Sequence, residues 1–324
     1  MGAALSVVIM ADIVTLGELL IDFTSVGTNE QGQLLFARNP GGAPANVAVA
    51  VAKLGGSSAF IGKIGSDMHG DFLRSTLQEN GVDCDGLVTD TEHFTTLAFV
   101  GIKDDGEREF SFARKHGADK MLCVDDIPVD KINGSKIFHF GSVSLTDEPS
   151  RNATLFAAKT AELSGVTVAY DPNYRASLWE NEATAILHMR DALRFADLVK
   201  VSDEETLLLT GETDFRKAAE ILVEGGAKIA VVTLGKDGAY VCTKSGGAKV
   251  DGYKVNAVDC TGAGDSFWGA FLLKVAQSGK TPSEITLDEA ADFARFANAA
   301  ASVCVEGSGA IPSLPSTEDI EKRL

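Results

Sequence analysis

The sequence predicts an α/β fold in three layers, with helices on both faces of a mostly parallel sheet. Apolar runs of strand length recur along the chain with helix-length segments between them, which is the pattern of consecutive βαβ units. Two glycine turns, at 41–42 and 262–264, each open an apolar segment of helix length. The 324 residues, 45% of them hydrophobic, suffice for one large domain with a substantial core.

The expected elements follow in chain order. Strands are predicted where short apolar runs occur, and helices where longer segments carry spaced apolar residues. The predicted strands are 13–23, 59–64, 137–140, 166–170, 198–201 and 229–234. The predicted helices are 45–54, 71–79, 149–163, 182–195, 215–223, 266–277 and 287–303.

One stretch departs from this alternation. Segments 95–102 and 108–113 read as half-buried antiparallel strands around the turn Asp104-Asp105-Gly106, with no helix between them. Such a hairpin cannot sit in a parallel sheet without a crossover, so it is predicted to project from the main body as a lid. Repeats and obvious linkers are lacking, which favours a single domain over 1–324 with lid segments near 22–38 and 95–115.

Composition excludes several functions. Lys and Arg total 29 against 46 Asp and Glu, a formal charge of −17, which argues against nucleic-acid and membrane partners. Five cysteines without C-x-x-C spacing suit free thiols in a reducing compartment. The first eleven residues lack a basic leader and a cleavage site, so no signal peptide is expected. Together these features predict a cytoplasmic protein.

The segment Asp259-Cys-Thr-Gly-Ala-Gly-Asp265-Ser-Phe267 stands directly before an apolar helix. Glycines at a helix N-terminus let backbone N–H groups surround an anion, and the helix dipole adds positive potential. Asp265 beside such a site could accept a proton from an alcohol while the amides stabilise a transferring phosphoryl group. Taken alone, the glycines favour a plainer interpretation, a capping Asp after a Gly turn.

Other glycine segments are less specific. The turn 41–46, Gly-Gly-Ala-Pro-Ala-Asn, fits close approach of a polyhydroxylated ligand with Asn46 and Asp22 binding its hydroxyls, or simply a tight loop with Pro near a helix start. Segment 233–238 reads as strand, Gly turn and strand. A P-loop is excluded because Gly235-Lys236 precedes Asp237, and 262–264 lacks the third glycine of a dinucleotide fingerprint.

Together these segments resemble the ribokinase-type (pfkB-like) carbohydrate kinase family from about residue 13 to 315. Both family signatures are present, at 41–56 and at 259–267. Within the family the chain is most similar to fructokinases, through the segments 17–23, 106–110, 138–145 and 171–175. The resemblance implies a ribokinase-like α/β/α fold with a small β-sheet lid. It also implies an ATP-dependent sugar kinase acting on the 6-hydroxyl of fructose.

The resemblance also implies roles for particular residues. Asp265 matches the catalytic base, and Gly262, Ala263 and Gly264 match the anion hole. Positions matching substrate contacts are Asp22, Gly41, Gly42, Asn46, Arg114 and Arg175. Positions matching nucleotide contacts are Asn173, Lys200, Thr233, Gly235, Gly238 and Asn298. Glu205 matches a residue that orders water around Mg²⁺, and a monovalent cation, K⁺, would lie near Asp259, Thr261, Cys304, Gly307, Gly309 and Ser313. Relatives with lid sheets pair through them, which suggests a homodimer.

Two departures from the family pattern affect these expectations. The Asn that usually accompanies the Mg²⁺-ordering residue is Ser202 here. Where fructokinases commonly carry Arg-Asn-Pro-Ser-Ala-Asp, residues 114–119 read Arg-Lys-His-Gly-Ala-Asp, and Lys115 adds a charge that could favour an acidic sugar. The alternatives are therefore a 2-keto-3-deoxygluconate kinase or another sugar or nucleoside kinase of the family. Strand alternation should point Lys115 away from the face that Arg114 presents to the sugar, which favours fructose.

A sugar-binding module without catalytic activity is the contrasting class. Such a module would have no need for an acidic residue, an anion site and a nucleotide loop in one chain. The sequence therefore favours an enzyme.

Overall fold

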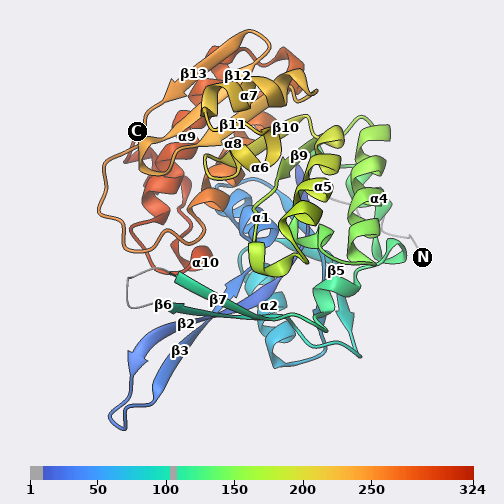
Figure 1. The fold of residues 1–324 in the computed structure, drawn as a ribbon, viewed down its shortest axis with the longest axis vertical. Helices are drawn as coiled ribbons and strands as arrows, with labels where there is room; N and C mark the ends of the chain where they lie inside the picture. The colour runs from blue at the N-terminus through green and yellow to red at the C-terminus, as the bar shows by residue number, and fades with distance from the viewer. Residues whose placement is uncertain (1–9, 103–107) are drawn as a thin grey trace, which may run out of the picture.

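The computed structural model describes residues 10–102 and 108–324. Within them the larger sheet has nine strands in the order β13-β12-β11-β10-β9-β8-β1-β4-β5 (Figure 1). The parallel strands are β1 (Ile13–Leu16), β4 (Ser58–Gly65), β5 (Asp83–Asp90), β8 (Ile137–Gly141), β9 (Thr167–Asp171), β10 (Leu198–Ser202) and β11 (Ile229–Thr233). At one edge of the sheet, β12 (Ala239–Thr243) runs antiparallel to β11, and β13 (Gly246–Val250) runs antiparallel to β12.

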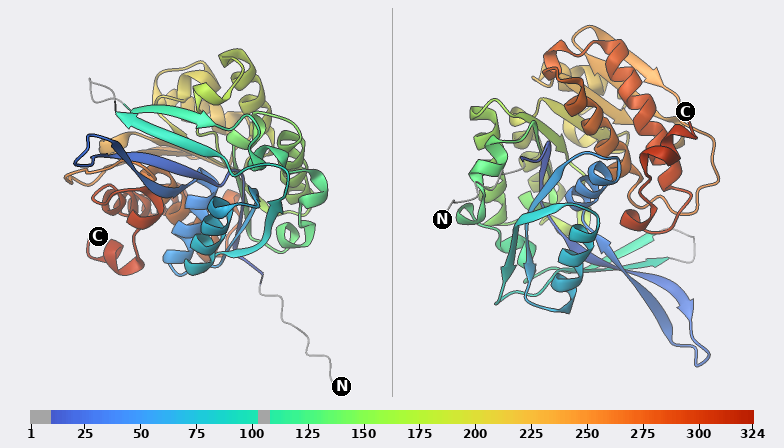
Figure 2. Two further views of the ribbon diagram at one scale, coloured as in Figure 1. Left: turned by 90° about the horizontal axis from the view of Figure 1, so that it is seen from below. Right: turned by 180° about the vertical axis from the view of Figure 1, so that it is seen from behind.

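Helices cover both faces of this sheet, as the views in Figures 1 and 2 show. One face carries α3 (Val129–Asn133), α4 (Ser150–Leu163), α5 (Glu182–Ala192), α6 (Thr206–Thr210) and α7 (Phe215–Glu224). The other carries α1 (Ala43–Lys53), α2 (Met68–Glu79), α8 (Ala263–Ser278), α9 (Leu287–Cys304), α10 (Ala310–Ser313) and α11 (Thr317–Glu321). The predicted three-layer α/β/α fold is confirmed.

Each face has its own aromatic core. Phe140 stacks on Tyr170 with ring centroids 4.7 Å apart on one side of the sheet, and Trp268 stacks on Phe271 at 5.5 Å on the other. All four side chains are buried. Burial of this much apolar surface holds the layers together.

A second sheet of four strands lies beside the carboxyl edge of the main sheet (Figure 1). Its order is β3-β2-β6-β7, from β2 (Leu20–Thr28), β3 (Leu34–Gly41), β6 (Leu97–Ile102) and β7 (Arg108–Ala113). The segments expected to form a lid thus pair in one sheet. The expected turn at 104–106 lies outside the described residues, as do residues 1–9 of the apolar N-terminal segment.

The structure differs from the sequence predictions at several elements, including the short helices and β13, and two of these differences have a clear physical reason. The single strand expected over 13–23 is two strands in different sheets, β1 and β2, because the chain turns at Gly17, where an added Cβ would lie 2.5 Å from Pro44 Cγ. The continuous apolar run conceals this turn. Strand β5 was missed because Asp83, Asp85 and Asp90 interrupt its apolar pattern, as an edge strand permits. None of the described helices combines the length and apolar character needed to cross a membrane.

Candidate active site

A cavity of about 950 Å³ lies between the second sheet and the carboxyl edge of the main sheet. Ligands of α/β proteins bind at this edge, where loops from several strands meet. Many of the predicted site residues line the cavity: Asp22, Gly42, Asn46, Asn173, Arg175, Lys200, Asp259, Thr261, Gly262, Gly264 and Asp265. Segments that are far apart in the sequence therefore meet at one place.

Asp265 lies in the first turn of α8 and is 9% exposed. The side-chain amide of Asn46, from the first turn of α1, donates a hydrogen bond of 2.7 Å to Asp265 Oδ2. Burial raises the pKa of Asp265 to about 6, against the lowering effects of the Asn46 hydrogen bond and the Lys200 charge. A carboxylate that is mostly ionised at neutral pH, yet more basic than usual, suits a general base.

The glycine turn before Asp265 forms the start of α8. Gly262 has φ of 80°, and a Cβ there would lie 2.7 Å from the Ala310 Cβ, so the turn requires glycine. The N–H groups of the first helical turn lack acceptors within the helix and point toward this end of it. The Ala263 N–H donates to the Cys260 carbonyl at 3.3 Å, and the helix dipole adds positive potential at this end of α8.

Lys200 lies beneath this turn. Its Nζ is 2.5 Å from Asp171 Oδ2, and both side chains are buried. A Cβ added to Gly264 would be 3.4 Å from the Lys200 Nζ. Burial acts to lower the pKa of Lys200, but the carboxylates of Asp171 and Glu205 outweigh it and raise the pKa. A fixed ammonium therefore lies next to the anion site.

Glu205 connects two loops at the same edge. Its Oε1 accepts the Tyr174 N–H at 2.6 Å, and its Oε2 accepts the Ser202 N–H at 2.9 Å. Ser202, in place of the usual Asn, therefore contributes its backbone. Asn173, next to Tyr174, adopts a left-handed φ of 50°. Glu205 does not line the cavity, whereas its neighbour Glu204, which sequence reasoning missed, does.

A second cavity of about 620 Å³ adjoins the first, and Cys260 lines both. Of the predicted nucleotide positions, Gly235 and Asn298 line it, whereas Thr233 and Gly238 do not. Asn298 Nδ2 donates to the carbonyl oxygens of Val250 and Asp251, at 3.1 and 3.2 Å. The 620 Å³ cavity is partly lined by apolar side chains. The sequence analysis did not identify these residues: Tyr253, Val255, Ala257 and Val305.

Arg114 differs from its expected position. Its guanidinium donates to Asp119 Oδ2 at 2.7 Å, Thr146 Oγ1 at 2.7 Å and the Val143 carbonyl at 3.0 Å. It is 4% exposed and does not line the 950 Å³ cavity. Arg114 and Lys115 lie beyond the end of β7, so the alternation of side chains along a strand does not apply to them. Lys115 is exposed, and both residues border a shallow pocket next to the larger cavity.

Three predicted substrate positions remain, Asp22, Gly41 and Arg175. An added Cβ on Gly41 would overlap Asp22 Oδ2, so the Asp22 carboxylate lies against the first glycine turn. Arg175 lines the cavity and is exposed there.

The residues expected near a monovalent cation also come together. Asp259 accepts the N–H groups of Thr261 at 2.7 Å and Gly309 at 3.0 Å. Cys304 Sγ donates to the Thr261 carbonyl at 3.8 Å, and Gly307 lies against the Ser313 side chain. The segments 259–261 and 304–309 are therefore held together beside the anion turn.

Glu18 is the most notable residue that sequence reasoning missed. It lines the 950 Å³ cavity, is 5% exposed, and its Oε1 accepts the Ala43 N–H at 3.0 Å. Burial raises the pKa of Glu18 to about 7. Its only sequence signal was its place in the segment 17–23 that resembles fructokinases.

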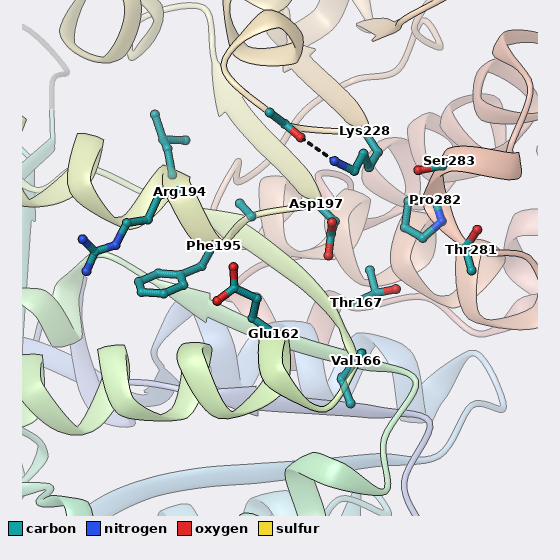
Figure 3. A pocket seen from close by; sticks show the side chains of 14 residues that line it. Glu162, Val166, Thr167, Arg194, Phe195, Asp197, Lys228, Thr281, Pro282 and Ser283 are labelled. Carbon is teal, nitrogen blue, oxygen red and sulfur yellow. Dashed lines mark hydrogen bonds between the residues drawn. The ribbon is translucent and has the colours of Figure 1, made fainter.

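A smaller cavity of about 350 Å³ lies at the opposite edge of the sheet, near the starts of β9, β10 and β11 (Figure 3). Lys228 there donates to the Gly226 carbonyl at 3.0 Å. None of the predicted site residues lines this cavity, so it is separate from the candidate site.

The chain belongs to the pfkB family of carbohydrate kinases, whose model matches residues 10–317. Among curated proteins it is 45% identical to probable fructokinase-5 of Arabidopsis thaliana, over 96% of this chain and 97% of that one. It is 43% identical to fructokinase-2 of Oryza sativa subsp. japonica, over 94% and 91%. The family resemblance read from the sequence is confirmed.

Solved structures of fructokinases also match nearly the whole chain. The fructokinase of Xylella fastidiosa with bound ATP has a TM-score of 0.88 and 34% identity, over 97% of this chain and 98% of that one. The fructokinase of Vibrio cholerae O395 with fructose, ADP and calcium ion bound has a TM-score of 0.88 and 33% identity, over 97% and 99%. A double mutant of that enzyme, with fructose, ADP and potassium ion bound, has a TM-score of 0.87 at 33% identity, over 97% and 98%. The predicted ribokinase-like fold is confirmed.

Proposed function

We propose that the protein is an ATP-dependent fructokinase that phosphorylates the 6-hydroxyl of D-fructose. The observation that carries the proposal is the buried Asp265, held by Asn46 at the head of a glycine turn that separates two adjoining cavities. Relatives named as fructokinases match nearly the whole chain, and solved relatives hold fructose and nucleotide.

The arrangement supports a direct transfer. Fructose occupies the larger cavity and ATP the smaller one, with the turn 259–265 between them. Asp265 Oδ takes the proton of the 6-hydroxyl as the sugar oxygen bonds to the γ-phosphorus, and the bond from phosphorus to the ADP oxygen breaks. The N–H groups of 262–264 and the Lys200 ammonium stabilise the negative charge on the transferring group.

Metal ions have suitable positions. Glu205 keeps lone pairs beyond its two backbone hydrogen bonds and, with Glu204 nearby, would hold Mg²⁺ through water. Bound Mg²⁺ would neutralise phosphate charge. Backbone oxygens around Thr261 and Gly309 would hold K⁺, and a potassium ion is bound in one Vibrio cholerae structure.

The alternative of a ketodeoxygluconate kinase rests on Lys115. That side chain borders a pocket that shares Phe112 and Leu178 with the candidate sugar cavity, but Lys115 itself does not line the sugar cavity. An exposed ammonium that does not line the sugar cavity contributes little to carboxylate recognition, which favours a neutral sugar.

We also propose a cytoplasmic homodimer. All five cysteines are free, which suits a reducing compartment. The second sheet exposes Leu34, Leu35 and Phe36 of β3, and Phe36 contacts Phe99 of β6 at 5.9 Å. A second copy could cover this apolar surface.

A coupled assay of ADP release tests the function. Fructose, ketodeoxygluconate, ribose and nucleosides are compared as acceptors, and fructose should give the highest kcat/KM. A higher kcat/KM with any other acceptor would contradict the assignment.

A further inference from the structure

Glu18 lies where the chain passes from the main sheet to the second sheet. Its backbone carbonyl packs so closely on Gly42 that a Cβ there would overlap it. Its side chain reaches α1, where Oε1 accepts the Ala43 N–H at 3.0 Å. Glu18 is thereby fixed against the first glycine turn of the candidate sugar site.

The second carboxyl oxygen of Glu18 has no such partner. Oε2 is buried and makes no hydrogen bond within the described part of the chain, although the side chain lines the 950 Å³ cavity. The same holds for Asn46 Oδ1, whose amide nitrogen is bonded to Asp265. Buried polar atoms are almost always paired, because an unpaired one costs free energy.

The two unpaired oxygens belong to one wall. Glu18 accepts the backbone N–H of Ala43 at the start of α1, and Asn46 follows three residues later in the first turn of the same helix. Accepting the Ala43 N–H needs only one oxygen, so helix capping accounts for Oε1 and not for Oε2. Glu18 and Asn46 thus each bring a buried, unpaired acceptor to the same cavity, and a ligand that carries several hydroxyl groups would supply the missing donors.

We propose that Glu18 is a substrate contact, whose Oε2 accepts a hydrogen bond from a sugar hydroxyl beside Asn46 Oδ1. This inference rests on the proposed function, in that the ligand is a sugar. It adds a further acidic residue to the sugar site beside Asp22 and Asp265, distinct in role from Asp265, which takes the proton of the reacting hydroxyl.

Charged groups around Glu18 make its ionisation sensitive to ligand. Arg114 and Asp119 act on it with opposite sign, and Asp22, Lys200 and Asp265 line the same cavity. Burial holds the pKa of Glu18 at about 7. A hydroxyl donor favours the ionised form, so fructose should bind more tightly as the pH rises through 7.

The test is Glu18→Gln. The amide oxygen can still accept the Ala43 N–H, while an NH₂ group replaces the Oε2 acceptor. Titration calorimetry should show the Kd for fructose rising at least about tenfold, with the Kd for ATP within twofold and the melting temperature little changed. Between pH 6 and 8 the wild-type Kd for fructose should fall as the pH rises. The part of this change that comes from Glu18 should be absent from the variant. Glu284→Gln is the control, because Glu284 also accepts a backbone N–H but lies outside the cavity.

Monodeoxy analogues of fructose sharpen the result. For the analogue that lacks the contacted hydroxyl, wild type and Glu18→Gln should bind alike. An unchanged fructose Kd in a folded variant, or equal losses of fructose and ATP binding together with a lowered melting temperature, would overturn the contact.

The proposed function is judged separately. The proposed function depends on whether the wild type phosphorylates fructose. The Glu18 contact depends on the difference in fructose Kd between the wild type and the Glu18→Gln variant. If another sugar of the panel proves to be the substrate, the same pair of proteins is titrated with that sugar.

Discussion

Replacing Asp265 with Asn should abolish turnover and make the protein more stable at alkaline pH. The amide cannot take the proton of the sugar hydroxyl, and loss of a positioned base typically lowers kcat by ~10²–10⁴. Asn keeps an oxygen that can accept the 2.7 Å hydrogen bond from Asn46, so the pocket should keep its shape. Binding of ATP should persist.

The stability effect follows from the pKa of Asp265. Burial raises it from 3.8 to about 6, so folding favours the protonated form. Two pKa units correspond to about 3 kcal/mol. This cost is fully present above pH 6, shrinks as the pH falls, and vanishes below about pH 4. The Asp265→Asn variant avoids it, so its advantage should be largest at pH 8 and smaller at pH 5.

Two measurements check these expectations. A coupled assay measures kcat, and urea denaturation at pH 5 and pH 8 measures the free energy of unfolding. Asp288→Asn is a matched control, because Asp288 is an exposed acidic residue in the first turn of α9. A variant retaining more than a tenth of the wild-type kcat would refute the base assignment (about 1.4 kcal/mol or less of lost transition-state stabilisation). A variant that is less stable than wild type at pH 8 would refute the electrostatic reasoning.

Three further changes have defined outcomes. Lys200→Met leaves Asp171 buried without its cation, so the free energy of unfolding should fall by about 3–5 kcal/mol and the KM for ATP should rise; unchanged stability in urea would argue against a buried ion pair. Lys115→Ala should alter kcat/KM for fructose less than about threefold, an effect under ~1 kcal/mol, whereas a ketodeoxygluconate preference that collapses in this variant would reverse the substrate assignment. Amide hydrogen exchange in β6 and β7 should slow when fructose saturates the enzyme, because a kinase must exclude water from the transferring phosphoryl group; equal rates with and without fructose would count against closure of the lid.

Local pattern was enough to predict the layers and most elements. Strands β8 to β11 and helices α4 to α9 lie within a few residues of their predicted ranges, apart from the short α6, because their apolar periodicity reflects burial on one or both faces. The prediction was wrong at 17–19, where the chain leaves one sheet for another without a change in hydrophobicity. Here the fold depends on the packing of Gly17 against Pro44, a tertiary contact that periodicity cannot reveal.

In the candidate site, too, local motifs could be read from the sequence, whereas tertiary contacts could not. The glycine turns and Asp265 could be identified because their chemistry is local. The internal partners of Arg114, which are Asp119, Thr146 and the Val143 carbonyl, could not be read from the sequence. Glu18 carried no local sign of a site, and the role proposed for it rests on burial and an unpaired oxygen.

The position of Asp265 depends on how closely two helices approach. Asn46 and Asp265 are 219 residues apart in sequence, and their hydrogen bond requires α1 and α8 to lie side by side. Gly269 of α8 makes this possible, because a Cβ there would come within 2.6 Å of the Ala50 Cβ and 3.1 Å of the Val47 carbonyl. A larger side chain would push the helices apart and separate Asn46 from Asp265. The same spacing holds the first glycine turn, Glu18 and Asn46 opposite the anion turn, so helix packing in the core sets the geometry of both halves of the site.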